Sequence, residues 1–390
     1  MTQHWLKATL PIAALYAFRM LGLFMLIPVF TILAPDLSYA TPTLIGVALG
    51  AYGLSQGILQ MPFGLLSDKW GRKPLLTLGL LLLVGGSLLG AYTTSIYGMI
   101  IARILQGGGA IGSVLMATLA DTVDEAPRTK AMAIIGMTIG ISFSVALVIS
   151  PIISSYYGLK GLFLFTTLLA FLGLAIVAFV LPSLPNPTHS NTSILLIKQI
   201  WKNKTLQQLN FGIFCQHFIL TTTFYAIPLL LRQFIQQSAL TSTWQFYLPI
   251  MLGAFILMMP LIIIGEKKKK SDFVFSIAIA MTLLSQGLLS VFFSHWLAFV
   301  GTVFVYFIMF NYLEANLPSK ISKKAPSEAK GTAMGIYSSF QFLGIFLGGV
   351  SSGLCYSHFN VHGIFIMNMM IAGAWFFING LKPLVNASPQ

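Results

Sequence analysis

Residues 64–74 read Gly64-Leu65-Leu66-Ser67-Asp68-Lys69-Trp70-Gly71-Arg72-Lys73-Pro74, and they join two long apolar runs at 44–66 and 75–92. Each run is long enough to cross a bilayer, which takes about 20 residues of helix. A short polar turn would be enough to connect two such helices. This stretch instead holds an acid, a Gly-Arg-Lys cluster and a proline in a fixed order, which indicates a specific role for the turn.

The residue types in this turn suit a tight hairpin between helices. Gly71 permits a sharp bend, and Pro74 suits the first turn of the next helix, where a missing N–H costs little. Asp68 and Arg72 can pair with each other or with charges on neighbouring helices. The simpler interpretation is a basic cytoplasmic loop, but the rule that places positive charge inside asks for charge and not for this spacing.

The composition is that of a polytopic membrane protein. The 390 residues are 56% hydrophobic and only 8% charged, whereas about 25% is usual in soluble domains. We expect an all-α integral membrane protein with twelve spans, at 10–34, 44–66, 75–93, 96–121, 130–157, 161–181, 207–234, 244–265, 272–291, 296–320, 330–357 and 361–381.

The net charge of +13 is a topology signal. With the N-terminus in the cytoplasm, most of the 22 lysines and arginines fall on the cytoplasmic side. We therefore expect a multi-pass protein of a bacterial inner membrane with both termini in the cytoplasm. Its basic residues would contact the lipid bilayer and not a nucleic acid.

The chain divides into two similar halves. A Pro-rich polar stretch follows the sixth span, and an amphipathic pattern at 194–202 follows it. Segment 115–120 resembles 313–318, and 129–134 resembles 331–336. These echoes predict a six-helix bundle at 1–181, a cytoplasmic linker at 182–206 and a second six-helix bundle at 207–390, which is typical of duplicated transporters.

Few ionisable side chains lie inside the spans, and each is a functional candidate because charge in a membrane is costly. Glu314 is the one carboxylate well inside a span, and His217 is the one histidine deep in a span. We hypothesise that Glu314 carries a coupling proton, with His217 as its partner or as a second site. The alternatives are a structural ion pair for Glu314 and a hydrogen-bonded core histidine for His217.

The opening stretch resembles the loop between helices 2 and 3 of the major facilitator superfamily, G-x-L-x-D-x-x-G-R-K. The resemblance implies two six-helix bundles and a conformational latch, in which Asp68 caps helix 11 and Arg72 pairs with Asp121. The latch would comprise Gly64, Asp68, Gly71, Arg72, Lys73 and Asp121. The corresponding stretch of the second half, 265–272, keeps charge but loses the pattern, so the latch is expected on one side.

Segment 103–110 resembles the helix 4 pattern R-x-x-Q-G-x-G-x-A of proton-coupled members of that family. By this resemblance Arg103 faces the cavity and interacts with polar groups of helix 1. Segments 17–25, 62–68 and 330–335 are similar to the YajR-like bacterial drug/proton antiporters. The helix 5 pattern of drug antiporters is matched in part, because Ser150 replaces the glycine before Pro151.

These observations predict proton-coupled export of small amphiphilic compounds, of the multidrug type, by alternating access. The partners would be a small-molecule substrate and protons, with the proton gradient as energy source, no cofactor, and a monomeric protein. The expected cavity residues are Arg19, Arg103, Tyr16, Phe18, Phe224, Tyr225, Asn311, Tyr337 and Gln341.

The sequence is also compatible with two other functions. A proton-coupled carrier of one specific metabolite is the first, and two arginines in the cavity would suit an anionic one. A membrane receptor or assembly factor is the second, although neither the loop motif nor a buried Glu314 is needed without a conformational cycle. An enzyme is not expected, because no nucleophile motif, metal-ligand spacing or phosphate loop is present. Cys215 and Cys355 both lie inside predicted spans, and we expect them to serve as small packing residues there.

Overall fold

The computed structural model describes residues 4–123, 125–181, 200–267, 271–326 and 330–380, and the regular structure within these residues is helical. Contacts divide the chain into two compact units, Met1–Asn191 and Thr192–Gln390. The amphipathic segment expected at 194–202 lies mostly outside the described residues. The predicted all-α membrane fold is confirmed.

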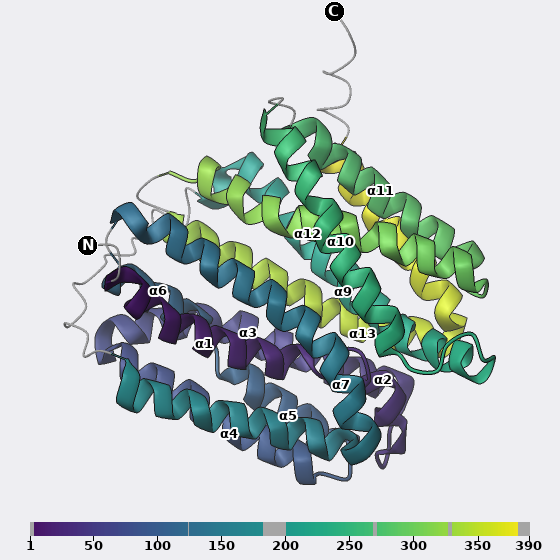
Figure 1. Cartoon of the computed structure of the whole chain (residues 1–390), viewed down its shortest axis with the longest axis horizontal. Coiled ribbons are helices and arrows are strands. Elements are labelled where there is room, and N and C mark those ends of the chain that lie inside the picture. Colours follow the sequence, from purple (N-terminus) through teal and green to yellow (C-terminus); the bar gives the residue numbers. More distant parts are fainter. Residues whose placement is uncertain (1–3, 124, 182–199, 268–270, 327–329, 381–390) are drawn as a thin grey trace, which may run out of the picture. The chain divides into compact units, whose positions relative to one another are not determined.

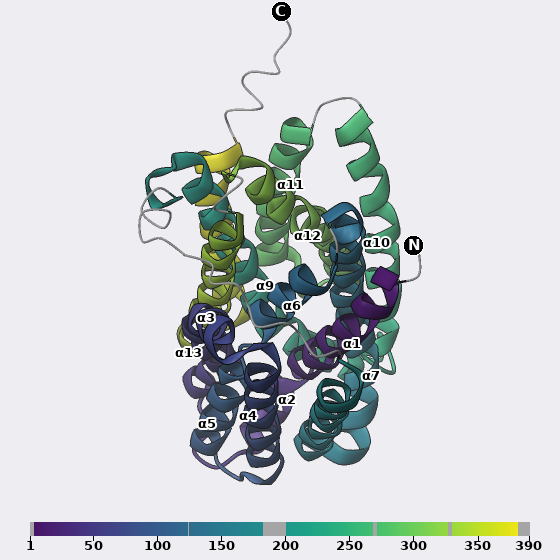
Figure 2. The same cartoon turned by 90° about the vertical axis from the view of Figure 1, so that its left-hand side faces the viewer.

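The described residues of the first unit form nine helical segments, of which Figure 1 labels α1 to α7. They are α1 (His4–Phe24), α2 (Phe30–Leu33), η1 (Ala34–Asp36), α3 (Pro42–Trp70), α4 (Arg72–Tyr92), α5 (Ile96–Gly108), α6 (Gly112–Thr122), α7 (Glu125–Ala175) and η2 (Ile176–Val180). Figure 2 shows α4 and α5 side by side.

The described part of the second unit contains α9 (Lys204–Gln236), α10 (Trp244–Lys267), α11 (Ser271–Phe292), α12 (Trp296–Lys324), α13 (Lys330–Trp375) and η4 (Phe376–Gly380). The main neighbour of α9 is α13. Asn203 caps α9 by accepting hydrogen bonds from the backbone N–H groups of Thr205 and Leu206.

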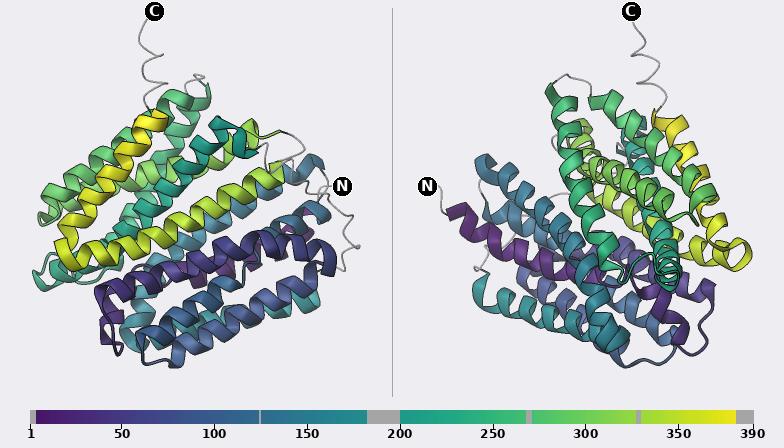
Figure 3. Two further views of the ribbon diagram at one scale, coloured as in Figure 1. Left: turned by 180° about the vertical axis from the view of Figure 1, so that it is seen from behind. Right: turned by 45° about the vertical axis from the view of Figure 1, so that its right-hand side comes forward.

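Ten helices in the described residues are long and apolar enough to cross a membrane. Two of these stretches have 51 residues, about 75 Å of helix, more than twice the thickness of a bilayer core. Each reverses at one non-helical residue, Gly158 (φ 59°) or Asn360 (φ 55°). Figure 3 shows the second reversal, in α13. Dividing both stretches there accounts for the twelve predicted spans.

Two expected spans are interrupted. The span at 10–34 is broken after Phe24, and a turn containing Pro28 separates α1 from α2. Proline lacks the N–H that a continuing helix needs and disfavours helix at the residue before it. The span at 96–121 is broken at Gly109, whose backbone (φ −71°, ψ 54°) is not helical. As a result, α6 begins in the middle of this span.

The hairpin between α3 and α4 is tighter than its polar sequence indicates. Asp68 lies within α3 and Arg72 begins α4, so Gly71 alone connects the helices. Gly71 has φ 91° and ψ 158°, a backbone conformation that residues with a Cβ rarely adopt.

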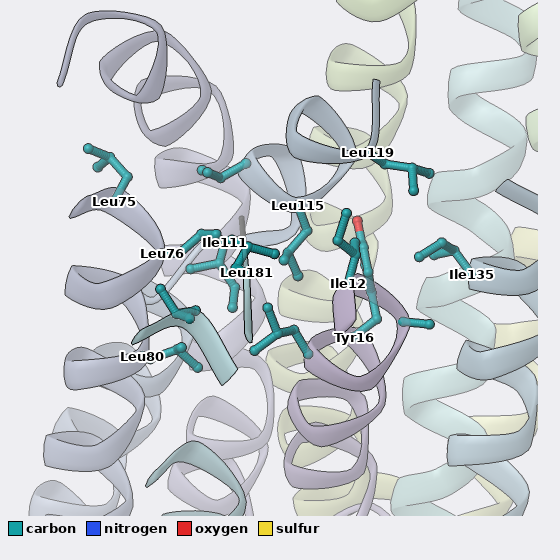
Figure 4. Packing of buried hydrophobic residues seen from close by; sticks show 14 of the residues in the cluster. Ile12, Tyr16, Leu75, Leu76, Leu80, Ile111, Leu115, Leu119, Ile135 and Leu181 are labelled. Atoms are coloured by element: carbon teal, nitrogen blue, oxygen red, sulfur yellow. The ribbon is translucent and has the colours of Figure 1, made fainter. Parts of the chain in front are cut away.

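Leucine and isoleucine side chains of several helices form the core of the first unit (Figure 4). Leu76 and Leu80 of α4 pack with Ile111 and with Leu115 of α6. Tyr16 of α1 belongs to the same cluster and is 5% exposed. This core holds α1, α4 and α6 together, which sets the position of the α6 N-terminus.

Close contact between α4 and α5 requires a glycine at one position. A Cβ on Gly86 would lie 2.7 Å from Ala102 O and 2.7 Å from Gln106 N, whereas a Cβ on the adjacent Gly85 would meet no atom within 4 Å. We expect Gly86→Ala to destabilise the protein by about 1–3 kcal/mol, the usual cost of overpacking. Gly85→Ala is the matched control and should be neutral. Thermal unfolding of the purified proteins in detergent checks this, and equal stability of the two variants would contradict the close packing.

Candidate functional site

The second unit brings His217 of α9, Glu314 of α12 and Gln341 of α13 together. Gln341 Nε2 lies 2.8 Å from His217 Nε2, and Glu314 Oε1 lies 3.8 Å from the same nitrogen. His217 is 5% exposed. The Glu314 side chain is 38% exposed, but its Oε2 atom is buried and has no hydrogen-bond partner among the described residues.

These three side chains form a group that can hold a proton. If the amide of Gln341 donates to Nε2, the imidazole is neutral, with its proton on Nδ1. A proton arriving at Nε2 would lie near Glu314 Oε1, and Gln341 could then accept a hydrogen bond from Nε2–H at its Oε1 after its amide turns. The group therefore offers two sites for one proton, His217 on α9 and Glu314 on α12, and Gln341 on α13 is a hydrogen-bond partner of the first.

Aromatic side chains surround this group. The ring of Phe310 lies 6.2 Å from that of His217 and 6.2 Å from that of Tyr306. Tyr337, an expected cavity residue, is 4% exposed. Asn311, another expected cavity residue, is half-buried on α12. His217 and Glu314 thus lie close to several aromatic side chains.

A buried polar network was not expected from the sequence. Asn368 of α13 accepts a hydrogen bond from Thr222 Oγ1 (2.5 Å), and its Nδ2 donates to Thr223 Oγ1 (3.2 Å) and Gln286 Oε1 (3.0 Å). All four residues are 0% exposed. The run of threonines at 221–223 inside a predicted span is the sequence feature that could have revealed this network. Because buried polar groups require partners, the network fixes α9, α11 and α13 relative to one another.

Arg103 is buried in the first unit, and no carboxylate of the described residues lies within 4.0 Å of it. Its Nη1 donates to Gln106 Oε1 (2.8 Å), Gln106 Nε2 donates to Ser87 Oγ (2.8 Å), and its guanidinium lies 4.8 Å from the centre of the Tyr52 ring. These partners belong to α3, α4 and α5. The resemblance implied partners on helix 1, and the interactions found among the described residues differ from that expectation.

Arg19 of α1 is 3% exposed. Its Nε and Nη2 atoms are buried and have no hydrogen-bond partner among the described residues. Within the described residues, neither Arg19 nor Arg103 has a carboxylate oxygen within 4.0 Å. Two buried cations of the first unit, Arg19 and Arg103, therefore have no adjacent counter-charge among the described residues.

The other expected cavity residues are mostly packed. The Tyr16 hydroxyl donates to Gly112 O (2.7 Å). The ring of Phe224 lies 5.6 Å from that of Phe307, and the ring of Tyr225 lies 5.6 Å from that of Tyr356. Tyr16, Phe224 and Tyr225 are each at most 5% exposed, and Phe18 is half-buried.

The residues of the expected latch gather around Arg72. Its Nη1 donates to Ser67 Oγ (2.5 Å) and Asp68 Oδ1 (2.5 Å), and its Nε donates to Asp121 Oδ2 (2.8 Å). The Arg72 side chain is 7% exposed, against 23% for Asp68 and 35% for Asp121. The pair between Arg72 and Asp121 that the resemblance implied is thus present in the structure.

The remaining latch residues have simpler surroundings. Gly64 faces Ser113, whose side chain would lie 3.6 Å from an added Cβ, and Lys73 is half-buried. In the described part of the chain, no group of three or more His, Cys, Asp or Glu residues is arranged to hold a metal ion.

Comparison with known proteins agrees with this architecture. The sequence profile of the Major Facilitator Superfamily matches residues 12–349 and 211–385. The inner membrane transport protein YajR of Escherichia coli is 41% identical over 381 residues, which cover 96% of this chain and 83% of that protein. The class B tetracycline resistance protein of Escherichia coli is 36% identical over 117 residues, 29% of this chain and 27% of that protein.

A solved structure has the same fold. The human organic anion transporter MFSD10 superposes with a TM-score of 0.71 at 17% identity, covering 96% of this chain and 99% of that one. At this identity the likeness is one of fold alone.

Proposed function

The chain belongs to the major facilitator superfamily and is a multi-pass membrane transporter, and from this premise we propose that it exports small amphiphilic compounds in exchange for protons. The observation that carries the proposal is the group formed by Glu314, His217 and Gln341. Ionisable residues inside spans are rare because they are costly, and those that occur commonly serve ion or substrate pathways.

The proposed coupling follows from the chemistry of this group. With Glu314 protonated, its carboxyl group is neutral and can face a low-dielectric environment. After release of the proton, the carboxylate regains charge and favours an environment with water or a positive partner. A switch between two such environments is what alternating access provides, so the proton can drive it.

The proposal of drug-type export rests on similarity. YajR matches nearly the whole chain, and a tetracycline resistance protein matches part of it. The aromatic and apolar residues around Glu314 suit amphiphilic ligands, since adaptable sites combine apolar walls with few polar groups.

The cluster around Arg72 is proposed as the latch of one conformation. A guanidinium held by Asp68, Asp121 and Ser67 stabilises the hairpin between α3 and α4 together with the end of α6. Because Asp68 and Asp121 are partly exposed, water can solvate both carboxylates when the cluster opens, whereas the buried guanidinium of Arg72 must move toward solvent at the same time.

We further propose an inner-membrane location with both termini in the cytoplasm, a monomeric protein, and the proton gradient as the only energy source. The distribution of lysine and arginine supports this orientation.

Everted membrane vesicles test the proposed function. Respiration acidifies their interior, and a pH-sensitive dye reports the gradient. An antiporter releases protons when its substrate is added, so dye fluorescence should recover upon addition of a responding amphiphile. Cationic, neutral and anionic amphiphiles are added in turn, and vesicles without the protein are the control. Equal recovery in both preparations for every compound would contradict proton-coupled export of amphiphiles.

A carrier of a specific anionic metabolite is the second candidate. The observation that favours it is the presence of two buried arginines, Arg19 and Arg103, without a carboxylate within 4.0 Å among the described residues. The same vesicle assay distinguishes the two functions, because a specific carrier would respond to none of the unrelated amphiphiles.

A further inference from the structure

The N-terminus of α6 lies inside the membrane span. α5 has 13 residues and α6 has 11, about 20 Å and about 16 Å of helix respectively. The break between them at 109–111 therefore falls near the middle of a bilayer core of about 30 Å. An interrupted membrane helix places the positive end of a helix dipole where a continuous helix would have none.

This helix end has no side-chain cap. The N-cap residue is Ile111, whose side chain cannot accept a hydrogen bond. The first intrahelical bond runs from Leu115 N to Ile111 O, so the N–H groups of the first turn have no acceptor within the helix. Uncapped helix N-termini favour negatively charged groups.

The guanidinium of Arg19 lies at this same helix end. A Cβ added to Gly112, the first residue of α6, would lie 3.0 Å from Arg19 Nη1 and 3.2 Å from Gln60 Nε2. Two donors therefore converge beside a residue that has no side chain. A cation at the positive end of a helix is electrostatically unfavourable, and Arg19 has no carboxylate within 4.0 Å among the described residues to offset it.

The neighbouring contacts hold this arrangement in place. Gln60 accepts a hydrogen bond from Gln56 Nε2 at its Oε1 (3.0 Å), which turns its own amide nitrogen toward Gly112. Ser113 Oγ donates to Gln60 O (2.8 Å), and the Tyr16 hydroxyl donates to Gly112 O (2.7 Å). The helices α1, α3 and α6 are thus joined around the guanidinium.

The unpartnered atoms of Arg19 specify the kind of anion. Nε and Nη2 form one edge of the planar guanidinium, and both are buried without a hydrogen bond among the described residues. This edge presents two parallel N–H groups, which match the two oxygens of a carboxylate. A buried cation whose donors are unused is costly, and an arriving anion would remove that cost.

We infer that Arg19, Gln60 and the N-terminus of α6 form a subsite for the carboxylate of the transported compound, which is therefore an amphiphilic organic anion. The substrate role rests on the proposed transport function, but the anion site itself does not. No residue of the second unit is needed to form it.

Equilibrium binding to the purified full chain, without a pH gradient, tests the site. The probes are acetate, benzoate and 1-naphthoate, each compared with its neutral amide, and ligand-induced shifts in thermal unfolding report binding. We expect the carboxylates to bind about tenfold or more tightly than their amides. Arg19→Gln should remove this preference for carboxylates over amides. Arg19→Lys keeps the charge but lacks the two parallel N–H donors of the guanidinium, and it should retain part of the preference.

Two further variants separate the site from general effects of charge and folding. Gly112→Ala keeps every charge but places a methyl group between the two donors, and it should weaken carboxylate binding. Arg232→Gln removes an exposed arginine of α9 and should bind like the wild type. Without ligand, Arg19→Gln should unfold at a higher temperature than the wild type, because it removes an uncompensated buried charge.

Three results would overturn the inference. These are equal responses of the wild type to carboxylates and amides, unchanged carboxylate binding in Arg19→Gln, and a lower unfolding temperature of unliganded Arg19→Gln, which would indicate a structural role. Carboxylate binding that depends on Arg19, together with no proton-coupled transport in vesicles, would refute the proposed export and leave the anion site established.

Discussion

Replacement of Glu314 by Gln is expected to abolish proton-driven transport while leaving the protein folded. The amide is nearly isosteric with the protonated carboxyl group, so it preserves the packing on α12 but cannot release a proton. Side chains that transfer protons typically contribute about 100-fold or more to the rates they support. We therefore expect transport in everted vesicles to fall to about one-hundredth of the wild-type rate or below.

An acid outside the proposed site is the control for this result. Asp272 lies in the first turn of α11, is 78% exposed at its side chain and pairs with Lys320. Asp272→Asn removes the same charge from the same unit and should transport normally. Full pH-driven transport by Glu314→Gln would refute the assigned role of Glu314. A His217→Asn variant would then show whether the imidazole carries the proton instead.

Replacement of Arg72 by Gln is expected to impair both stability and transport. Arg72 contacts Ser67, Asp68 and Asp121, so its loss leaves two carboxylates without their shared cation. Removing one partner of a fully buried pair costs about 3–5 kcal/mol. Because Asp121 is 35% exposed, we expect a smaller cost of about 1–3 kcal/mol. Transport should decrease because the latched conformation loses stability relative to the others.

Variants of the same hairpin make this prediction specific. Lys69→Gln removes an exposed positive charge of α3 and should have little effect, since exposed charges contribute little to stability. Arg72→Lys should recover little of the stability and transport, because a lysine ammonium cannot bond Asp68 and Asp121 at the same time as the planar guanidinium does. The thermal unfolding and vesicle transport of the three proteins should be measured side by side. Normal behaviour of Arg72→Gln would exclude the latch.

The hairpin motif shows how far local sequence reasoning reaches. Its spacing alone indicates the family and the importance of Arg72, and the pairing of Arg72 with Asp121 is present. The motif does not indicate that Gly71 alone connects the two helices. Propensity places the end of a helix within a few residues, whereas packing of its neighbours decides where it stops.

For the charged residues, too, the sequence identifies the positions but not the contacts between them. Hydropathy alone identifies Glu314, His217, Arg19 and Arg103 as unusual, because charges stand out in apolar segments. Which of them meet is not determined by the sequence. Glu314 and His217 are about a hundred residues apart, and pairing over such distances depends on how the helices pack.

The sequence by itself determined that this protein is an all-α membrane transporter, and it predicted twelve spans in two similar halves, because hydropathy, loop charge and a short motif are local properties of the chain. The tertiary structure alone decided where the fourth span breaks, that Gly112 lies beside Arg19, and that Thr222, Thr223, Gln286 and Asn368 share one network. These features depend on contacts between helices that are distant along the chain. Similar apolar surfaces fit many partners, and only the assembled bundle selects one set.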